Sequence, residues 1–171
     1  LGMAALLAGR GDAGWVLAAR RWTLPAWAFL TVGLALGSRW AYDVLGWGGY
    51  WGWDPVENAA LMPWLAATAL VHSLVAQERR GVFAVWNMGL LFVTYGLVVL
   101  GTFLTRAGLV TSVHSFARSD VGPACLVFTA VLLVVSFAVL WLRLDRLRAE
   151  RQVEGLLSRE GALLVGNLFF S

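Results

Sequence analysis

Long apolar stretches without a charged residue alternate with short charged segments along this chain. Four of them, residues 22–38, 58–77, 81–105 and 121–142, hold 17, 20, 25 and 22 residues. A helix crosses a hydrocarbon core of about 30 Å with roughly 20 residues, within a range of about 17 to 25. The stretches lack the alternation of apolar and polar residues that membrane strands show. The pattern predicts an all-α, polytopic bundle with four transmembrane helices over residues 22–142.

The two ends of the chain extend this pattern. Residues 1–21 are interpreted as the end of a preceding helix and a cytoplasmic connector, and residues 161–171 as the start of a further helix. Between them, residues 143–160 mix charges with leucines and valines, which favours an amphipathic cytoplasmic segment. The chain begins without methionine and ends inside an apolar run. We therefore expect a fragment of a longer membrane protein.

Composition and charge support a membrane protein and orient it. Hydrophobic residues make up 60% of the chain and charged residues 13%, about half the usual share of a soluble protein. All thirteen basic residues are arginine, and ten of them fall on connections that alternate to one side of the membrane. The positive-inside rule makes this the cytoplasmic side, so connections 39–57 and 106–120 face outward. The net charge of +3 thus indicates topology, not nucleic-acid binding, and Cys125 alone excludes an internal disulfide.

The outward connection at 39–57 is unusually aromatic. Six of the fourteen residues from Trp40 to Trp53 are Trp or Tyr, and four glycines lie among them. An interfacial belt accounts for one or two such rings at a helix end. Glycines permit turns and close approach of the backbone, so the combination favours a platform for a broad, flat, apolar ligand. The belt remains the alternative.

The segment from Asp54 to Glu57 is typical of a helix start. Asp54 can cap the helix, Pro55 suits its first position, and Glu57 can complete a capping box. Capping explains the two carboxylates better than an acid/base pair does. Further along, Pro63 predicts a kink.

The two histidines of the chain lie at different predicted depths. His72 follows Asp54 by 18 residues, about 27 Å along a helix, and an ionisable residue at membrane depth is a candidate functional site. It is either a neutral histidine bonded to another helix or an iron ligand. His114 lies in the outward connection and alone would be an ordinary surface histidine. With depths differing by about 20 Å, the two side chains cannot bind one iron.

The segment Trp47-Gly-Gly-Tyr-Trp-Gly-Trp-Asp-Pro-Val-Glu-Asn-Ala-Ala-Leu-Met-Pro-Trp-Leu closely resembles the tryptophan-rich WWD signature of a haem-handling superfamily. The version here is similar to that of the CcmF family, with an NrfE-like relative as the near variant. The resemblance continues around His72, through residues 100–108, and through 109–116. It covers roughly residues 22 to 120.

This resemblance implies a subunit of the haem lyase of cytochrome c maturation, multi-pass in the bacterial inner membrane with its outward loop in the periplasm. It implies axial ligation of a transient haem by His114 and of an embedded b-type haem by His72, with the second ligands elsewhere. It also implies that the loop contacts the transient haem and that neither carboxylate is an acid/base catalyst. The implied contacts are Trp47, Gly48, Gly49, Tyr50, Trp51, Trp53 and Asp54.

The partners that the resemblance implies are the haem chaperone CcmE, CcmH, apocytochrome c with its CxxCH thiols, membrane lipid and quinol as electron source. In this reading the protein positions haem for thioether attachment, as a holocytochrome c synthase subunit, and the embedded haem reduces it. Two alternatives stay open. One is a b-type haem and quinol redox protein with His72 as its site, and the other is a transporter, of haem or of another substrate, gated by the tryptophan loop.

Overall fold

The computed structural model describes residues 1–9, 13–46, 48–107, 110–113, 121–147, 161–162 and 165–166. All regular structure within these ranges is helical, which confirms the all-α prediction. The elements are α1 (Gly2–Ala8), α2 (Ala13–Leu45), α3 (Pro55–Arg80), α4 (Ala84–Arg106), α5 (Val121–Leu142) and α6 (Leu144–Leu147).

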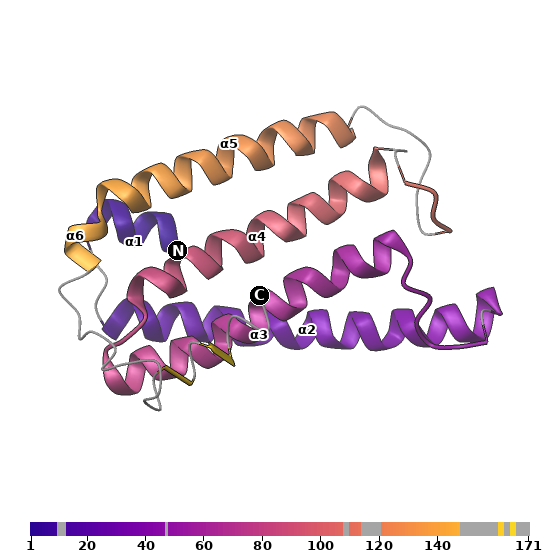
Figure 1. Ribbon diagram of the computed structural model, residues 1–171, viewed down its shortest axis with the longest axis horizontal. Helices are drawn as coiled ribbons and strands as arrows, with labels where there is room; N and C mark the ends of the chain where they lie inside the picture. The colour runs from indigo at the N-terminus through magenta and orange to yellow at the C-terminus, as the bar shows by residue number, and fades with distance from the viewer. Residues whose placement is uncertain are drawn as a thin grey trace.

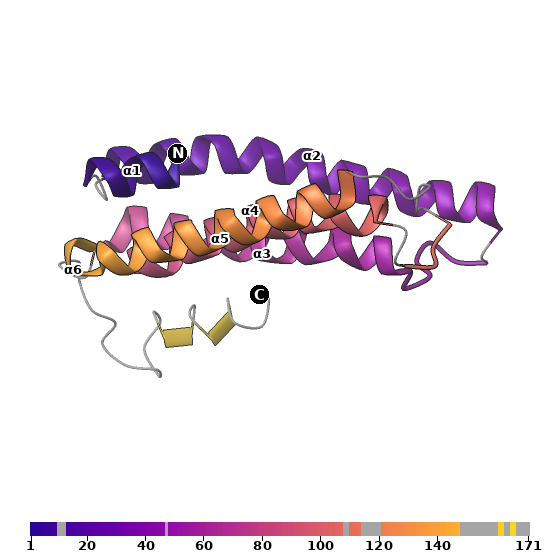
Figure 2. The same cartoon turned by 90° about the horizontal axis from the view of Figure 1, so that it is seen from above.

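The helices form two layers. Helices α3, α4 and α5 lie side by side in chain order (Figure 1), and α2 covers α3 from a second layer (Figure 2). The short α1 packs against α4 and α5. Among the described helices, α3, α4 and α5 are long and apolar enough to cross a membrane. Helix α2, which contains the stretch 22–38, is not one of these three, so the fourth predicted crossing stays a prediction.

The helices run up and down between two ends. The α2–α3 loop and the end of α4 lie at one end, whereas the ends of α3 and α5 lie at the other (Figure 1). Arg79 and Arg80 close α3, and Arg143 directly follows α5. The predicted grouping of these arginines at one end is therefore confirmed, while the side of the membrane that they face stays a prediction.

The interhelical loop is shorter than the predicted 39–57. Helix α2 continues to Leu45, where Gly46 adopts a left-handed φ of 64°, and α3 begins at Pro55. The prediction placed the loop where the charges begin, but a charge ends an apolar run without ending a helix. Arg39 instead supports the helix through an ion pair with Asp43, one turn later, at 3.2 Å. Charged residues do not end the helix at its other end either: α2 begins at Ala13, within the predicted connector 1–21, and includes Arg20 and Arg21.

A buried polar cluster fixes α3 against α4. The Nδ2 group of Asn87 donates to Oε1 of Gln77 at 2.7 Å and to the Ser73 carbonyl at 3.2 Å, and the Ser73 hydroxyl donates to Asn87 Oδ1. On the other side of α3, Arg20 of α2 pairs with Glu78. Buried polar groups that pair in this way set one relative position of two helices. Helix α3 is thus held on two sides.

Candidate functional site

The tryptophan-rich loop ends at a carboxylate that anchors it. Oε2 of the buried Glu57 accepts hydrogen bonds from the backbone N–H of Gly52 at 2.9 Å and of Asp54 at 3.2 Å. Oδ2 of Asp54 accepts from the N–H of Val56 at 3.0 Å. These bonds form the capping box that the sequence predicts, and Pro55 occupies the first turn as expected. The capping role is confirmed.

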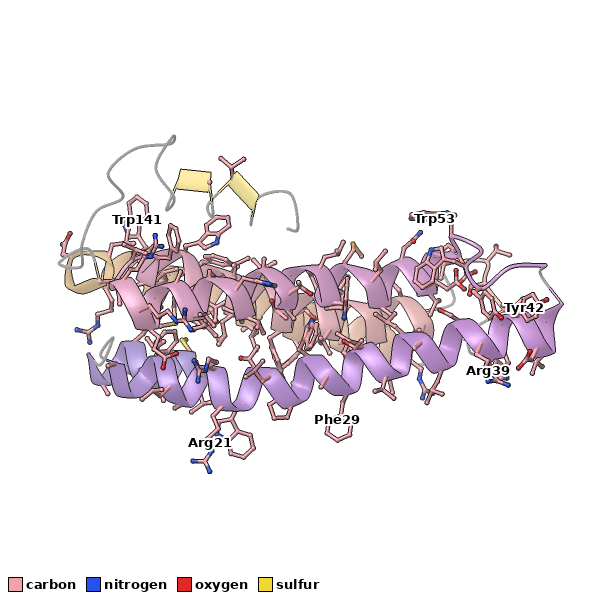
Figure 3. The ribbon with its side chains drawn as sticks, turned by 90° about the horizontal axis from the view of Figure 1, so that it is seen from below. Arg21, Phe29, Arg39, Tyr42, Trp53 and Trp141 are labelled. Atoms are coloured by element: carbon pink, nitrogen blue, oxygen red, sulfur yellow. The ribbon has the colours of Figure 1, made fainter. Side chains whose placement is uncertain are left out.

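Trp53 is held in a conformation that tryptophan rarely adopts. Its φ is 56°, in the left-handed region. Glu57 accepts hydrogen bonds from the residues on both sides of Trp53, and Asn58 Nδ2 donates to the Trp53 carbonyl at 3.1 Å. The Trp53 side chain is 71% exposed and projects away from the helices (Figure 3). A strained backbone fixed by three hydrogen bonds, with an indole turned outward, is the arrangement expected of a ligand-contacting residue.

Replacing Glu57 by alanine should release this loop. Two backbone N–H groups lose a charged acceptor, which costs about 2 kcal/mol of local stability. Hydrogen exchange at Gly52 and Asp54 is then expected to accelerate by about 30-fold. The Glu57→Gln variant keeps an acceptor oxygen and should show a smaller effect. Asp43→Ala, which removes an exposed ion pair, serves as the control. Unchanged exchange in Glu57→Ala would contradict the anchoring role.

The other aromatic side chains join the loop to α2. Tyr42 and Tyr50 stack with ring centroids 4.6 Å apart, and Trp51 meets Trp53 edge to face at 6.2 Å. Tyr50 is exposed, whereas Trp51 is half-buried. Tyr42 and Trp53 lie at the same end of the bundle (Figure 3). Exposed rings are therefore gathered at this end, and Trp47 lies outside the described residues.

Trp51 lines a shallow apolar hollow between α2 and α3. Its volume is about 180 Å³, and Gly33 and Gly37 leave open space on its α2 side. The lining residues are Leu30, Gly33, Leu34, Gly37, Ser38, Trp51, Val56, Glu57 and Ala60. Pockets that enclose a drug-sized ligand hold roughly 300–1,000 Å³. The hollow is smaller than this range, whereas the rings of Tyr50 and Trp53 are exposed.

A second outer segment is tied to this loop. The Ser112 hydroxyl donates to Oδ2 of Asp54 at 2.6 Å and so connects the segment after α4 to the start of α3. His114 lies outside the described residues, but it follows Ser112 by two residues, at most about 7 Å of chain. The sequence carried no local sign of this hydrogen bond. Asp54 therefore acts as a cap and as an anchor for a distant segment.

His72 lies on α3 with its side chain exposed. Nδ1 is 2.8 Å from the carbonyl oxygen of Thr68. Because a carbonyl only accepts, Nδ1 carries the proton in this hydrogen bond, and in the neutral imidazole this leaves a lone pair on Nε2. No group of three or more metal-binding side chains occurs in the described part of the chain. His72 is thus suited to be a single protein ligand to a metal that has other ligands of its own.

Several known proteins are similar to this chain in sequence. A family model described as cytochrome C assembly protein matches residues 9–111. The cytochrome c-type biogenesis protein CcmF of Pseudomonas aeruginosa is 52% identical over 97% of this chain and 25% of its own length. CycK of Rhizobium meliloti is 49% identical over 99% of this chain and 25% of its own length, and NrfE of Haemophilus influenzae is 43% identical over 89% and 24%.

A solved structure described as cytochrome c heme lyase CcmF has a similar fold. It matches with a TM-score of 0.79 and 42% identity, over 99% of this chain and 25% of that one. The chain spans about a quarter of the length of the relatives that it matches.

Proposed function

The chain belongs to the cytochrome c assembly protein family, and from this premise we propose that it is the haem-handling part of a haem lyase subunit in the bacterial inner membrane. The observation that carries the proposal is Trp53, held outward by three hydrogen bonds in a strained backbone. A surface that only faces lipid would not require this restraint. The proposal has an outer and an inner site.

The outer site would hold haem as a substrate. The exposed rings of Tyr50 and Trp53 supply flat apolar contacts at one end of the bundle, and the hydrogen bond from Ser112 to Asp54 brings the segment that precedes His114 to the same end. His114 would ligate the iron, and the rings would orient the porphyrin. Attachment adds each cysteine S–H of the apocytochrome across a haem vinyl group, forming one C–S and one C–H bond. The protein contributes orientation and water exclusion to this addition.

The inner site would hold a b-type haem on His72. The exposed imidazole, with its proton on Nδ1, fits this group because Nε2 is the atom that a haem iron requires. When bound, such a haem supplies one-electron chemistry for keeping the substrate haem reduced, with quinol as the proposed electron source. His72 would supply one axial ligand and fix its direction. The second ligand would come from another part of the longer protein.

The topology follows from the same premise. The end that carries the aromatic loop would face the periplasm, where CcmE delivers haem and where CcmH and apocytochrome c meet it. The arginine-rich end would face the cytoplasm. Neither Asp54 nor Glu57 is assigned a proton-transfer role, since both are occupied as backbone acceptors.

Deletion of the full-length gene tests this function. We expect holocytochrome c to disappear while apocytochrome persists, and the purified full-length protein to show a haem absorbance spectrum. A haem spectrum combined with normal holocytochrome after deletion would instead favour a b-type redox protein. A colourless protein whose deletion leaves cytochromes unchanged would favour a transporter and overturn both haem sites.

A further inference from the structure

Helices α2 and α3 are joined by two matching hydrogen-bonded pairs. Each helix carries a tryptophan followed four residues later by a threonine, namely Trp27 with Thr31 and Trp64 with Thr68. The indole N–H of Trp27 donates to the Thr68 hydroxyl at 2.9 Å, and that of Trp64 donates to the Thr31 hydroxyl at 2.8 Å. The two indole rings stack with centroids 6.5 Å apart and planes 20° apart.

Each of the two threonine hydroxyls also donates a hydrogen bond within its own helix. Thr68 donates to the Trp64 carbonyl at 2.7 Å, and Thr31 donates to the Trp27 carbonyl at 2.8 Å. Each of these two hydroxyls therefore accepts from the opposite helix and donates within its own helix. In an apolar surrounding such reciprocal bonds fix the register of two helices.

Only one of the two pairs is linked by a hydrogen bond to a histidine. The carbonyl of Thr68 accepts from Nδ1 of His72, so one residue joins the interhelical bond and the imidazole. Trp64, Thr68 and His72 follow each other at four-residue intervals on one face of α3. The mirror residue Thr31 has no histidine four residues later, since Ala35 occupies that position.

We infer that Trp27 and Thr68 are positioning residues for His72, which aim its Nε2 at the iron of the inner haem. The inference rests on the proposed ligation by His72. Bonds that hold the second ring nitrogen of a metal-binding histidine set the orientation and basicity of the ring, and their loss typically costs about 10- to 100-fold in affinity. In the variants below the bond to Nδ1 remains, while Thr68, whose carbonyl accepts it, loses the bond that its hydroxyl accepts from Trp27 of α2, so an effect at the lower end of this range is expected.

The test uses the full-length, haem-loaded protein and four variants. Trp27→Phe removes the indole donor, and Thr68→Val removes the hydroxyl with little change in volume. Thr68→Ser keeps the hydroxyl, and Thr31→Val breaks the mirror bond without touching the residue that bonds His72. Haem retention during dilution and the low-spin electron paramagnetic resonance g values, which report axial ring orientation, are measured for each.

We expect Trp27→Phe and Thr68→Val to retain haem about 10-fold less well and to shift the g values, with Thr68→Ser restoring both. Thr31→Val should match the wild type in both readings. Equal effects of Thr68→Val and Thr31→Val on haem retention and on the g values would show that both pairs act only in helix packing, and would overturn the inference. If His72→Gly itself leaves the haem signals unchanged, the ligand assignment fails first, and this outcome is distinguishable from failure of the positioning role alone.

Discussion

Replacing His72 by glycine in the full-length protein is expected to abolish the b-type haem that we propose for the inner site. His72 is the one histidine of α3, and the other histidine of this sequence, His114, follows α4. Glycine removes the ligand, and because the His72 side chain is exposed, its loss leaves no gap in the described helix packing. Reduced-minus-oxidised absorbance spectra and extracted haem per protein measure the result.

Added imidazole provides the control for this variant. Free imidazole can ligate the iron in place of the missing side chain, so the spectrum should return at millimolar imidazole if the loss was a loss of ligation. Failure of that rescue, with a normal amount of folded protein, would indicate that His72 supports packing instead. A full haem complement in His72→Gly without imidazole would contradict the inner site.

The sequence predicted the elements that local chemistry determines. Asp54, Pro55 and Glu57 lie within one helical turn, so the capping box follows from spacing alone, and the structure contains it. The apolar stretches 58–77, 81–105 and 121–142 likewise predict α3, α4 and α5, because an uninterrupted apolar run has few folded alternatives in lipid. The remainder of segment 143–160 beyond α6 lies outside the described residues.

The sequence did not predict contacts between distant residues. The donors and acceptors that join Trp27 to Thr68 and Ser112 to Asp54 are separated by 41 and 58 residues. Serine and threonine bond to many partners, and most bond within their own helix. The left-handed φ of Trp53 could not be predicted from the sequence either, because this rare backbone conformation depends on the hydrogen bonds around the residue.

The second large effect is expected at the outer end, where His114→Gly should abolish thioether formation. Without that ligand the substrate haem would keep only the aromatic contacts and the second ligand expected elsewhere in the longer protein, and we expect it to dissociate before both vinyl groups react. Holocytochrome formation and haem bound to the purified protein are measured together. The embedded haem should persist in this variant, whereas it is lost in His72→Gly, so the two sites can be separated.

Ser112→Ala extends the same prediction to the described segment that precedes His114 in the sequence. The Ser112 hydroxyl donates to a carboxylate oxygen at 2.6 Å, and loss of such a charge-assisted bond costs about 1.5 kcal/mol. We therefore expect about 10-fold weaker retention of the substrate haem. Thr111→Ala, at the exposed neighbouring position, is the matched control. If Ser112→Ala and Thr111→Ala retain the substrate haem equally well while His114→Gly is inactive, the assignment of His114 as a ligand holds. In that case the bond from Ser112 to Asp54 does not position His114.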